Sequence, residues 1–443
     1  MLCKTINTYK DYFINYYIKI SKKYFVVMLI CTVSTAYSGF RQNDYKYPVN
    51  ISIDSNLSKS QNSRADIAHS IISVLAKASD DYNLNENILS RIGMSYLIFF
   101  TSLANHEVTG HGMRALELGS KEIIFSFNIF GGTTFYSPIL PFSLYKSSIV
   151  SLGGNEANYL LSQKIADNTF LMNDFTIDPI TSAAYMFSYG NQLFYAYVLS
   201  EQLAGHDLKA HAEYMQLMYG IGSLTTAKIR AKSFIDILDP ILLTSVYSLL
   251  FGQNVKVPSI NLSESITVVP TIRTVLTPYN TIEYKVGGYI KTYDKLMRLS
   301  ISYGKQSKTI KTNFKNYPEL YQIYNYIKDE KYVNSGLLSS VTKNEKVKKH
   351  NCYGLELKLF NLLSLNNINI GAVASLWHQP LIDTPDPFRA KAKTGFLFSV
   401  DASYQLNETL IITALGLYKT EGYVTGEFYK ANNRFALSIR TYL

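Results

Sequence analysis

Cysteine is scarce in this chain, with three in 443 residues: Cys3, Cys31 and Cys352. The first two lie in residues 1–38, which have the pattern of a cleaved export signal. Lysines there lead into a short apolar run, followed by a small-x-small cleavage site at residues 36–38. Loss of that signal would leave Cys352 as the sole cysteine, so no intramolecular disulfide is expected. The exported protein must then be stabilised by packing, a metal or a membrane.

Long apolar runs are also missing. No run approaches the roughly 20 apolar residues that a membrane-crossing helix needs. Acidic residues are outnumbered, 33 against 43 lysines and arginines, and much of the net charge of +10 falls in the lysine-rich stretch 305–349. That stretch contains no arginine, and lysine alone is a weak indication of nucleic-acid binding. We expect a loop that is solvated or touches anionic lipid headgroups, and no nucleic-acid partner.

Two of the seven histidines flank a carboxylate in the segment His106-Glu107-Val108-Thr109-Gly110-His111. Zinc bound by neutral histidines lowers the pKa of a coordinated water to about 7, and a neighbouring carboxylate can act as general base in hydrolysis. The histidines are five positions apart, whereas the common H-E-x-x-H motif has them four apart. On a regular α-helix they would diverge by roughly 140°. A local π-helix would bring them together, and Gly110 tolerates such a distortion.

The written form H-E-x-x-G-H-G resembles the motif of the dipeptidyl-peptidase III family of zinc peptidases. The resemblance implies that His106 and His111 bind Zn²⁺, that Glu107 is the catalytic base, and that the substrate is a peptide or protein. It covers about seven residues. The second acidic motif of that family, E-E-x-R-A, is absent, which leaves the third metal ligand open.

Two residues compete to be that ligand. Glu156, our first choice, follows Asn155 and resembles the Asn-Glu ligand segment of thermolysin-like zinc peptidases. Asp239, in a Leu-Asp-Pro segment, resembles the L-D-G ligand segment of the site-2 intramembrane proteases. The order of elements is similar to that second family: a motif helix, a hairpin over residues 121–136, then a Gly-Gly-x-x-Ala-Asn helix. An edge strand of such a hairpin could hold a substrate backbone.

Two other histidines are interpreted without a metal. His206 and His211 repeat the five-residue spacing, with Asp207 and Glu213 nearby. We expect them on the surface of an ordinary helix, and a role beside the metal site is the less favoured alternative. The motif histidines also have an interpretation without a metal, because buried histidines are often hydrogen-bonded core residues.

The pattern along the chain predicts an α+β protein. After a flexible linker over 39–63, helical spacing dominates the metallopeptidase-like domain, residues 64–260. From 261 to 443 the period changes to two, as where Phe396, Phe398 and Val400 alternate with polar residues. Eight such segments, with alternately short and long connections, predict a C-terminal antiparallel β-barrel of about eight strands. They lie near residues 264, 281, 296, 353, 368, 394, 409 and 434. The alternative is a soluble sheet whose apolar face is buried against the helical domain.

The last strand resembles the terminal strand of bacterial outer-membrane barrels. We therefore predict a zinc-dependent metallopeptidase at the bacterial outer membrane, with outer-membrane lipid as a partner and the helical domain on the periplasmic side. The alternative function is a non-enzymatic outer-membrane protein whose helical domain binds a partner or plugs the barrel. A site-2-like protease is a third option.

Overall fold

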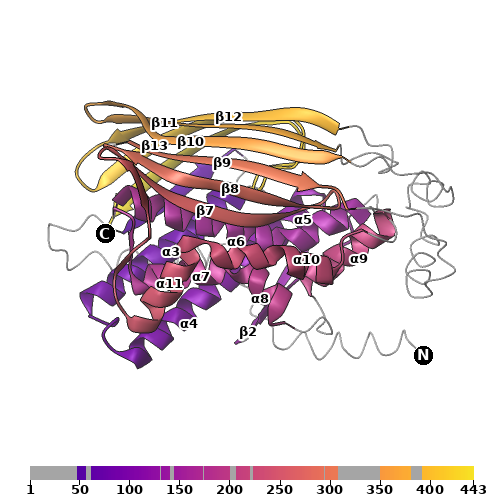
Figure 1. The fold of residues 1–443 in the computed structure, drawn as a ribbon, viewed down its shortest axis with the longest axis horizontal. Helices are drawn as coiled ribbons and strands as arrows, with labels where there is room; N and C mark the ends of the chain where they lie inside the picture. The colour runs from indigo at the N-terminus through magenta and orange to yellow at the C-terminus, as the bar shows by residue number, and fades with distance from the viewer. Residues whose placement is uncertain are drawn as a thin grey trace.

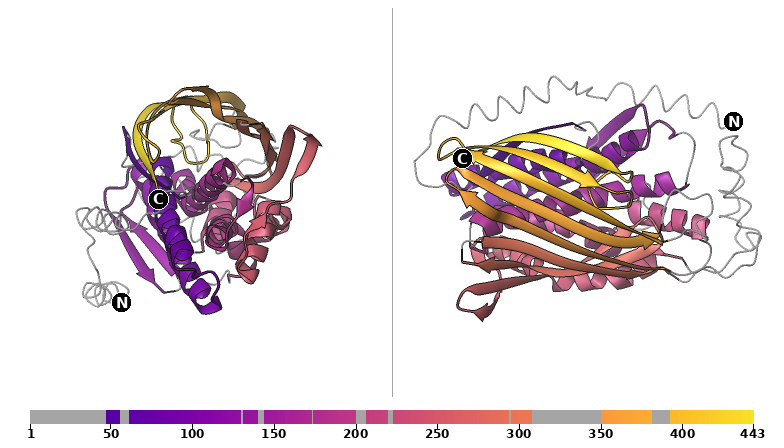
Figure 2. Two further views of the ribbon diagram at one scale, coloured as in Figure 1. Left: turned by 90° about the vertical axis from the view of Figure 1, so that its left-hand side faces the viewer. Right: turned by 90° about the horizontal axis from the view of Figure 1, so that it is seen from above.

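The computed structural model describes residues 47–55, 61–129, 131–139, 144–172, 174–199, 206–219, 223–293, 295–307, 350–380 and 392–443. A large curved sheet lies over a layer of helices (Figure 1). Seen from one end, the sheet is an arch with helices on its concave side (Figure 2). The expected signal, residues 1–38, and nearly all of the lysine-rich stretch 305–349 lie outside the described residues.

The longest described helix is α6, and other helices of the layer pack around it. Side-chain caps fix several helix starts: Asn87 caps α4, Asp178 caps α7 and Asp239 caps α11. The helices are α3 (Gln61–Asp81), α4 (Ile88–Ala104), the π-helix η2 (Asn105–Gly112), α5 (Met113–Glu117), α6 (Leu144–Met172), α7 (Pro179–Tyr189), α8 (Asn191–Tyr197), α9 (Asp207–Tyr219), α10 (Thr226–Ser233), the 3-10 helix η3 (Phe234–Leu238) and α11 (Pro240–Phe251).

Ten strands form the large sheet, in the order β1-β14-β13-β12-β11-β10-β9-β8-β7-β6, with every neighbour antiparallel. They are β1 (Pro48–Asp54), β6 (Ile260–Ser263), β7 (Ile266–Thr277), β8 (Thr281–Thr292), β9 (Lys295–Lys305), β10 (Asn351–Leu365), β11 (Ile368–Pro380), β12 (Ala392–Gln405), β13 (Leu410–Lys419) and β14 (Asn432–Tyr442). Two small sheets pair β2 (Ile123–Asn128) with β3 (Gly131–Tyr136) and β4 (Thr176–Ile177) with β5 (Val255–Lys256). The α+β class and the antiparallel sheet are confirmed, and β7 to β14 are the eight expected strands.

The closed barrel is wrong. Among the described residues, the edge strands β1 and β6 do not pair with each other, so the sheet is open. The reason is that β14 pairs with β1, from Pro48↔Tyr442 to Asp54↔Ala436, and not with β7. Residues 48–54 were expected in a flexible linker, but their backbone extends the ladder.

The two faces of the sheet differ sharply in polarity. Its convex face carries exposed apolar side chains; Phe398, for example, is 51% exposed. The others include Ile301, Tyr303, Tyr353, Leu355, Leu376, Phe396, Val400, Tyr404, Tyr418, Phe435, Leu437 and Ile439. The concave side holds ion pairs instead: Arg298 and Lys358 both bind Asp167 of α6, and Arg298 also binds Glu356. The sheet packs on the helical layer, and Val269, Tyr289 and Leu296 of its concave face belong to a core shared with the helices, while the exposed apolar side chains lie on the convex face.

No single helix in the described part of the chain is both long enough and apolar enough to cross a bilayer. One pair, Thr226–Leu238 with Pro240–Phe251, meets the length and composition test together but is bent by 71°.

Candidate metal centre

The motif segment forms a π-helix. Residues Asn105–Gly112 make the wider turn of η2, continuous with α4 before it and α5 after it. The i to i+5 bonding of a π-helix places residues five apart on one face. The predicted local distortion is confirmed, and it turns both motif histidines to the same side.

Glycines on α6 allow the motif helix to approach closely. A Cβ atom on Gly110 would lie 2.5 Å from Cα of Gly154, and a Cβ on Gly154 would lie 2.2 Å from Nε2 of His106. Real Cβ atoms are not found at such distances. The Gly153-Gly154 pair is therefore required for the imidazole of His106 to lie where it does.

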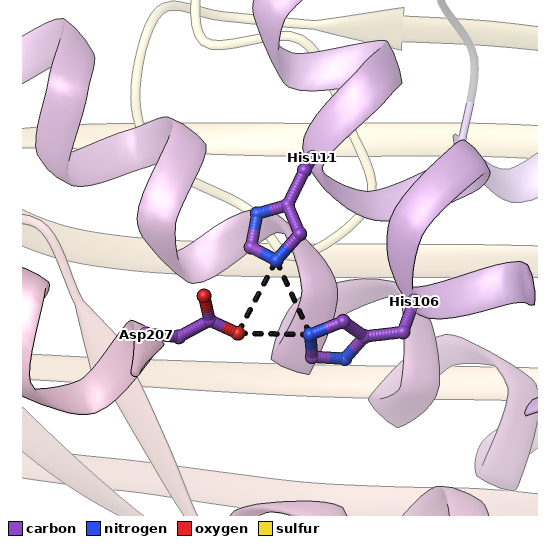
Figure 3. A group of neighbouring side chains, drawn as sticks. All are labelled: His106, His111 and Asp207. Atoms are coloured by element: carbon purple, nitrogen blue, oxygen red, sulfur yellow. Dashed lines mark hydrogen bonds and ion pairs between the residues drawn. The ribbon is translucent and has the colours of Figure 1, made fainter. Parts of the chain in front are cut away.

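His106 and His111 converge with Asp207, the first residue of α9 (Figure 3). The two Nε2 atoms are 3.2 Å apart. Oδ2 of Asp207 lies 2.8 Å from Nε2 of His106 and 3.2 Å from Nε2 of His111. Two ligands about 2 Å from one zinc ion at a tetrahedral angle lie about 3.3 Å apart. The three atoms therefore could hold a metal ion.

Neighbouring groups orient the imidazoles. Nδ1 of His111 lies 2.7 Å from the backbone oxygen of Val150 and donates to it, so the neutral ring has its Nε2 free for a metal. The amides of Asn191 and Asn158 lie 3.3 and 3.5 Å from Nδ1 of His106. The residues present fit a metal, because two imidazole Nε2 atoms and a carboxylate oxygen lie close together.

The charges of the site are coupled. Burial lowers the pKa of His111, but the carboxylate of Asp207 outweighs that effect and the pKa is raised to about 9. Burial likewise favours the neutral form of Asp207, yet the two imidazoles hold its pKa well below the usual value. Without a metal, the site is therefore a carboxylate paired with a protonated imidazole over a wide pH range.

Glu107 lies beside this group and is buried. Its Oε2 accepts a hydrogen bond of 2.7 Å from the hydroxyl of Thr134 on β3, which also donates to the backbone oxygen of Glu107 at 3.1 Å. Gly132 on the same strand leaves room for the carboxylate, because a Cβ there would lie 2.6 Å from Cγ of Glu107. The hairpin of β2 and β3 thus fixes the orientation of the candidate base.

Neither expected third ligand joins the histidines. Oε2 of Glu156 accepts from Nε of Arg114 at 2.8 Å, and its other oxygen pairs with Nη2 of Arg114 and with the backbone N–H of Gly426 at 2.7 Å. Arg114 thus holds Glu156 away from the metal group. Asp239 caps α11 through the N–H groups of Ile241 and Leu242, so it too is used elsewhere. Asp207 takes the place expected for them.

His206 and His211 are buried, so the expected surface location is wrong. Nδ1 of His211 lies 2.9 Å from the hydroxyl of Ser148, and burial lowers the pKa of His211 to about 3, which keeps it neutral. The ring of His206 lies edge-on to Tyr195. Tyr195 in turn stacks on His106 at 5.6 Å, with its hydroxyl 3.4 Å from Nε2. His206 thus reaches the site through Tyr195, a residue that no sequence pattern indicated.

No protein-family model matches this chain, and neither a curated protein nor a solved structure matches it. The resemblance to the dipeptidyl-peptidase III family therefore stays a prediction from seven residues. What the geometry supplies is two imidazoles and a carboxylate around one point, with a second carboxylate beside them.

Proposed function

We propose that this protein is a zinc-dependent metallopeptidase. The observation that carries the proposal is the convergence of His106, His111 and Asp207 on one point beside Glu107. Zinc held there would lower the pKa of a bound water to about 7 and polarise a peptide carbonyl. Two histidines and one carboxylate also suit Fe²⁺, so the identity of the metal belongs to the proposal.

In this proposal Glu107 is the general base. It follows a ligand directly in the sequence, and its carboxylate is fixed by Thr134. Glu107 would take a proton from the attacking water and later give it to the leaving amine. Tyr195, whose hydroxyl lies near Nε2 of His106, is placed to donate a hydrogen bond to the carbonyl oxygen as negative charge develops on it.

The substrate in this proposal is a peptide or protein segment in extended form. Each strand of the β2–β3 hairpin pairs only with the other within the described chain, so the hairpin has free edges. Thr134 contacts Glu107 from this hairpin. A peptide added to a free edge would gain main-chain hydrogen bonds next to the base.

We further propose that the protein lies at the bacterial outer membrane, with the convex face of the sheet toward lipid. That face is apolar, while ion pairs lie on the concave side. Soluble monomers rarely expose contiguous apolar surface beyond a few hundred Å². Lipid hydrocarbon would cover this face and leave the ion pairs of the concave side intact.

Metal content and peptide turnover test the enzymatic part. Purified full-length protein, folded in detergent, should contain one zinc per chain by elemental analysis, and His111→Ala should contain little. Glu107→Gln should keep the metal and lose hydrolysis of a fluorogenic peptide library. Glu122→Gln is the matched control, because Glu122 is exposed at the base of the hairpin and should keep both properties.

Two outcomes would contradict the proposal. Equal and negligible metal in wild type and His111→Ala would remove the metal centre. Retained metal without hydrolysis of any peptide would favour a non-enzymatic envelope protein whose helical domain binds a partner. One observation favours that second function: the side chains of His106, His111 and Asp207 are only 2, 9 and 12% exposed, so a peptide must open the site.

A further inference from the structure

Side chains of the helical layer bind backbone groups near both edges of the open sheet. At the first edge, the backbone N–H of Asn50 on β1 donates to the hydroxyl of Ser70 on α3 at 2.8 Å. That hydroxyl also lies 3.1 Å from the backbone oxygen of Asn50. The same hydroxyl donates to the backbone oxygen of Asp66 at 2.7 Å, so the serine is an acceptor for the N–H of Asn50 while its single hydrogen is shared between α3 and β1.

Two carboxylates bind β7 beyond the part covered by β6, which pairs only with the first residues of β7 and is itself an exposed edge strand. Oδ1 of Asp236 accepts from the backbone N–H of Thr274 at 2.6 Å, and Oδ2 of Asp239 accepts from that of Ile272 at 3.2 Å. The hydroxyl of Tyr189 donates to the backbone oxygen of Ile272. The helices thus supply the partners that a neighbouring strand would supply in a closed barrel.

The far side of the helical layer is as apolar as the convex face of the sheet. Its exposed side chains on α4 and α11 include Leu89 at 75% and Leu250 at 65%. Their neighbours are Ile88, Ile92, Tyr96, Leu97, Phe100, Leu243, Val246, Tyr247 and Phe251. α11 contains no charged residue. α4 contains only Arg91, whose guanidinium donates to the backbone oxygens of Asn85 and Leu250.

These two apolar faces are joined along the side of the molecule. Ile260 and Leu262 on β6 are exposed, and β6 lies in the chain between α11 and β7. In the end view the helices fill the open side of the arch, so sheet and helices surround one interior (Figure 2). The metal group, the ion pairs of Asp167 and the carboxylates of Asp236 and Asp239 all lie within this interior.

We propose that the sheet and the helical layer form one closed wall in a lipid bilayer, with hydrocarbon against both the convex sheet face and the face of α4 and α11. This inference rests on the proposed membrane location and extends it. In hydrocarbon an open sheet edge would leave backbone groups without partners, which is why strands span membranes as closed barrels. Here Ser70, Asp236, Asp239 and Tyr189 supply partners for backbone groups of Asn50, Ile272 and Thr274. The helical domain then lies beside the sheet within the membrane, not on its periplasmic side.

A nitroxide label measures which faces lie in lipid. Full-length protein, with its native cysteines replaced by serine, is folded into vesicles of phosphatidylethanolamine and phosphatidylglycerol. Single labels are placed by Leu97→Cys on α4 and Leu250→Cys on α11. Phe398→Cys on the convex sheet face is the positive control, and Lys209→Cys is the negative control, because Lys209 is an exposed charged residue of α9. The readout is collision with oxygen, which concentrates in lipid, against a polar nickel chelate.

We expect oxygen to be favoured at Leu97 and Leu250 as strongly as at Phe398, and severalfold more than at Lys209. Preference for nickel at the two helix positions, with oxygen still favoured at Phe398, would overturn this inference and leave the membrane location standing. Protection from both reagents would mean that a partner protein covers the helices, and would also overturn it. Preference for nickel at Phe398 would contradict the proposed membrane location itself. Zinc content, measured on the same samples, reports separately on the metal centre.

Discussion

Oδ2 of Asp207 lies 2.8 Å from Nε2 of His106, a residue 101 positions earlier in the chain. The carboxylate reaches the motif from the first turn of α9, which packs against α6 beside the histidines. This contact, and not one from Glu156 or Asp239, completes the group of side chains that could hold a metal ion.

Substituting Asp207 should therefore separate the two candidate ligand sets. We expect Asp207→Ala to lose at least about tenfold in zinc affinity, since one of three protein ligands is removed. Glu156→Gln should keep zinc but destabilise the fold, by less than the about 3 to 5 kcal/mol of a fully unpaired buried charge, because Arg114 keeps Glu117 as its partner. Chelator competition and urea unfolding measure the two effects. Zinc loss in Glu156→Gln with retention in Asp207→Ala would restore Glu156 as the ligand.

Zinc affinity should rise with pH. The pKa of His111 in the metal-free protein is raised to about 9, above the usual value of about 6.5, so a proton must leave before the nitrogen can bind zinc. We expect affinity to increase about tenfold per pH unit between about 6.5 and 9 and then to level off. The proton's contribution to metal-free stability is complete below about 6.5 and is lost as pH rises through about 9.

Chelator competition across that range gives the slope. His378→Gln is the control, because His378 lies on β11 of the sheet and should leave the slope unchanged. A flat profile would show that His111 carries no proton for zinc to displace.

Close helix contact should make Gly154 sensitive to a single methyl group. In Gly154→Ala the new Cβ would meet the ring of His106, so we expect loss of zinc and destabilisation of about 1 to 3 kcal/mol from overpacking. Gly93→Ala is matched to it, because a Cβ at Gly93 meets nothing within 4 Å. That substitution lies inside α4 and should stabilise by up to about 1 kcal/mol with zinc unchanged. Similar behaviour of the two variants would refute the contact.

Asp239 should matter for stability and not for zinc. Asp239→Ala removes the cap of α11 and leaves the N–H of Ile272 without its acceptor. The expected loss is about 2 to 4 kcal/mol, from about 1 for the cap and the rest for a buried donor. Asp81→Ala is the control, since Asp81 pairs with Lys77 at an exposed position and should cost less than about 1 kcal/mol. Zinc loss in Asp239→Ala would revive the site-2-like ligand set.

Local patterns in the sequence predicted local structure well. The five-residue spacing of His106 and His111, with Gly110 between them, predicted the π-helix. Alternation of apolar and polar residues predicted the eight strands from β7 to β14, because a period of two follows directly from strand geometry.

Features that depend on distant packing could not be read in the same way. Asp207 becomes a candidate ligand only because α9 packs near η2, and a lone aspartate at a helix start is an ordinary cap. The burial of His206 and His211 follows from that same packing. The open edges of the sheet were missed because alternation says which residues share a face, and not which strands form the edges. Ser70 and Asp236, which bind backbone groups near those edges, look like unremarkable helix residues in the sequence.

The pairing of β1 with β14 also bears on how the molecule assembles. Arg440 and Asn50 are hydrogen-bonded although 390 positions separate them, so that rung of the ladder forms only after nearly the whole chain has left the ribosome. Until then Pro48–Asp54 has no strand beside it, and such distant pairings are slow to form. A chain that is still being made therefore carries an unpaired strand segment that can associate with other exposed strands.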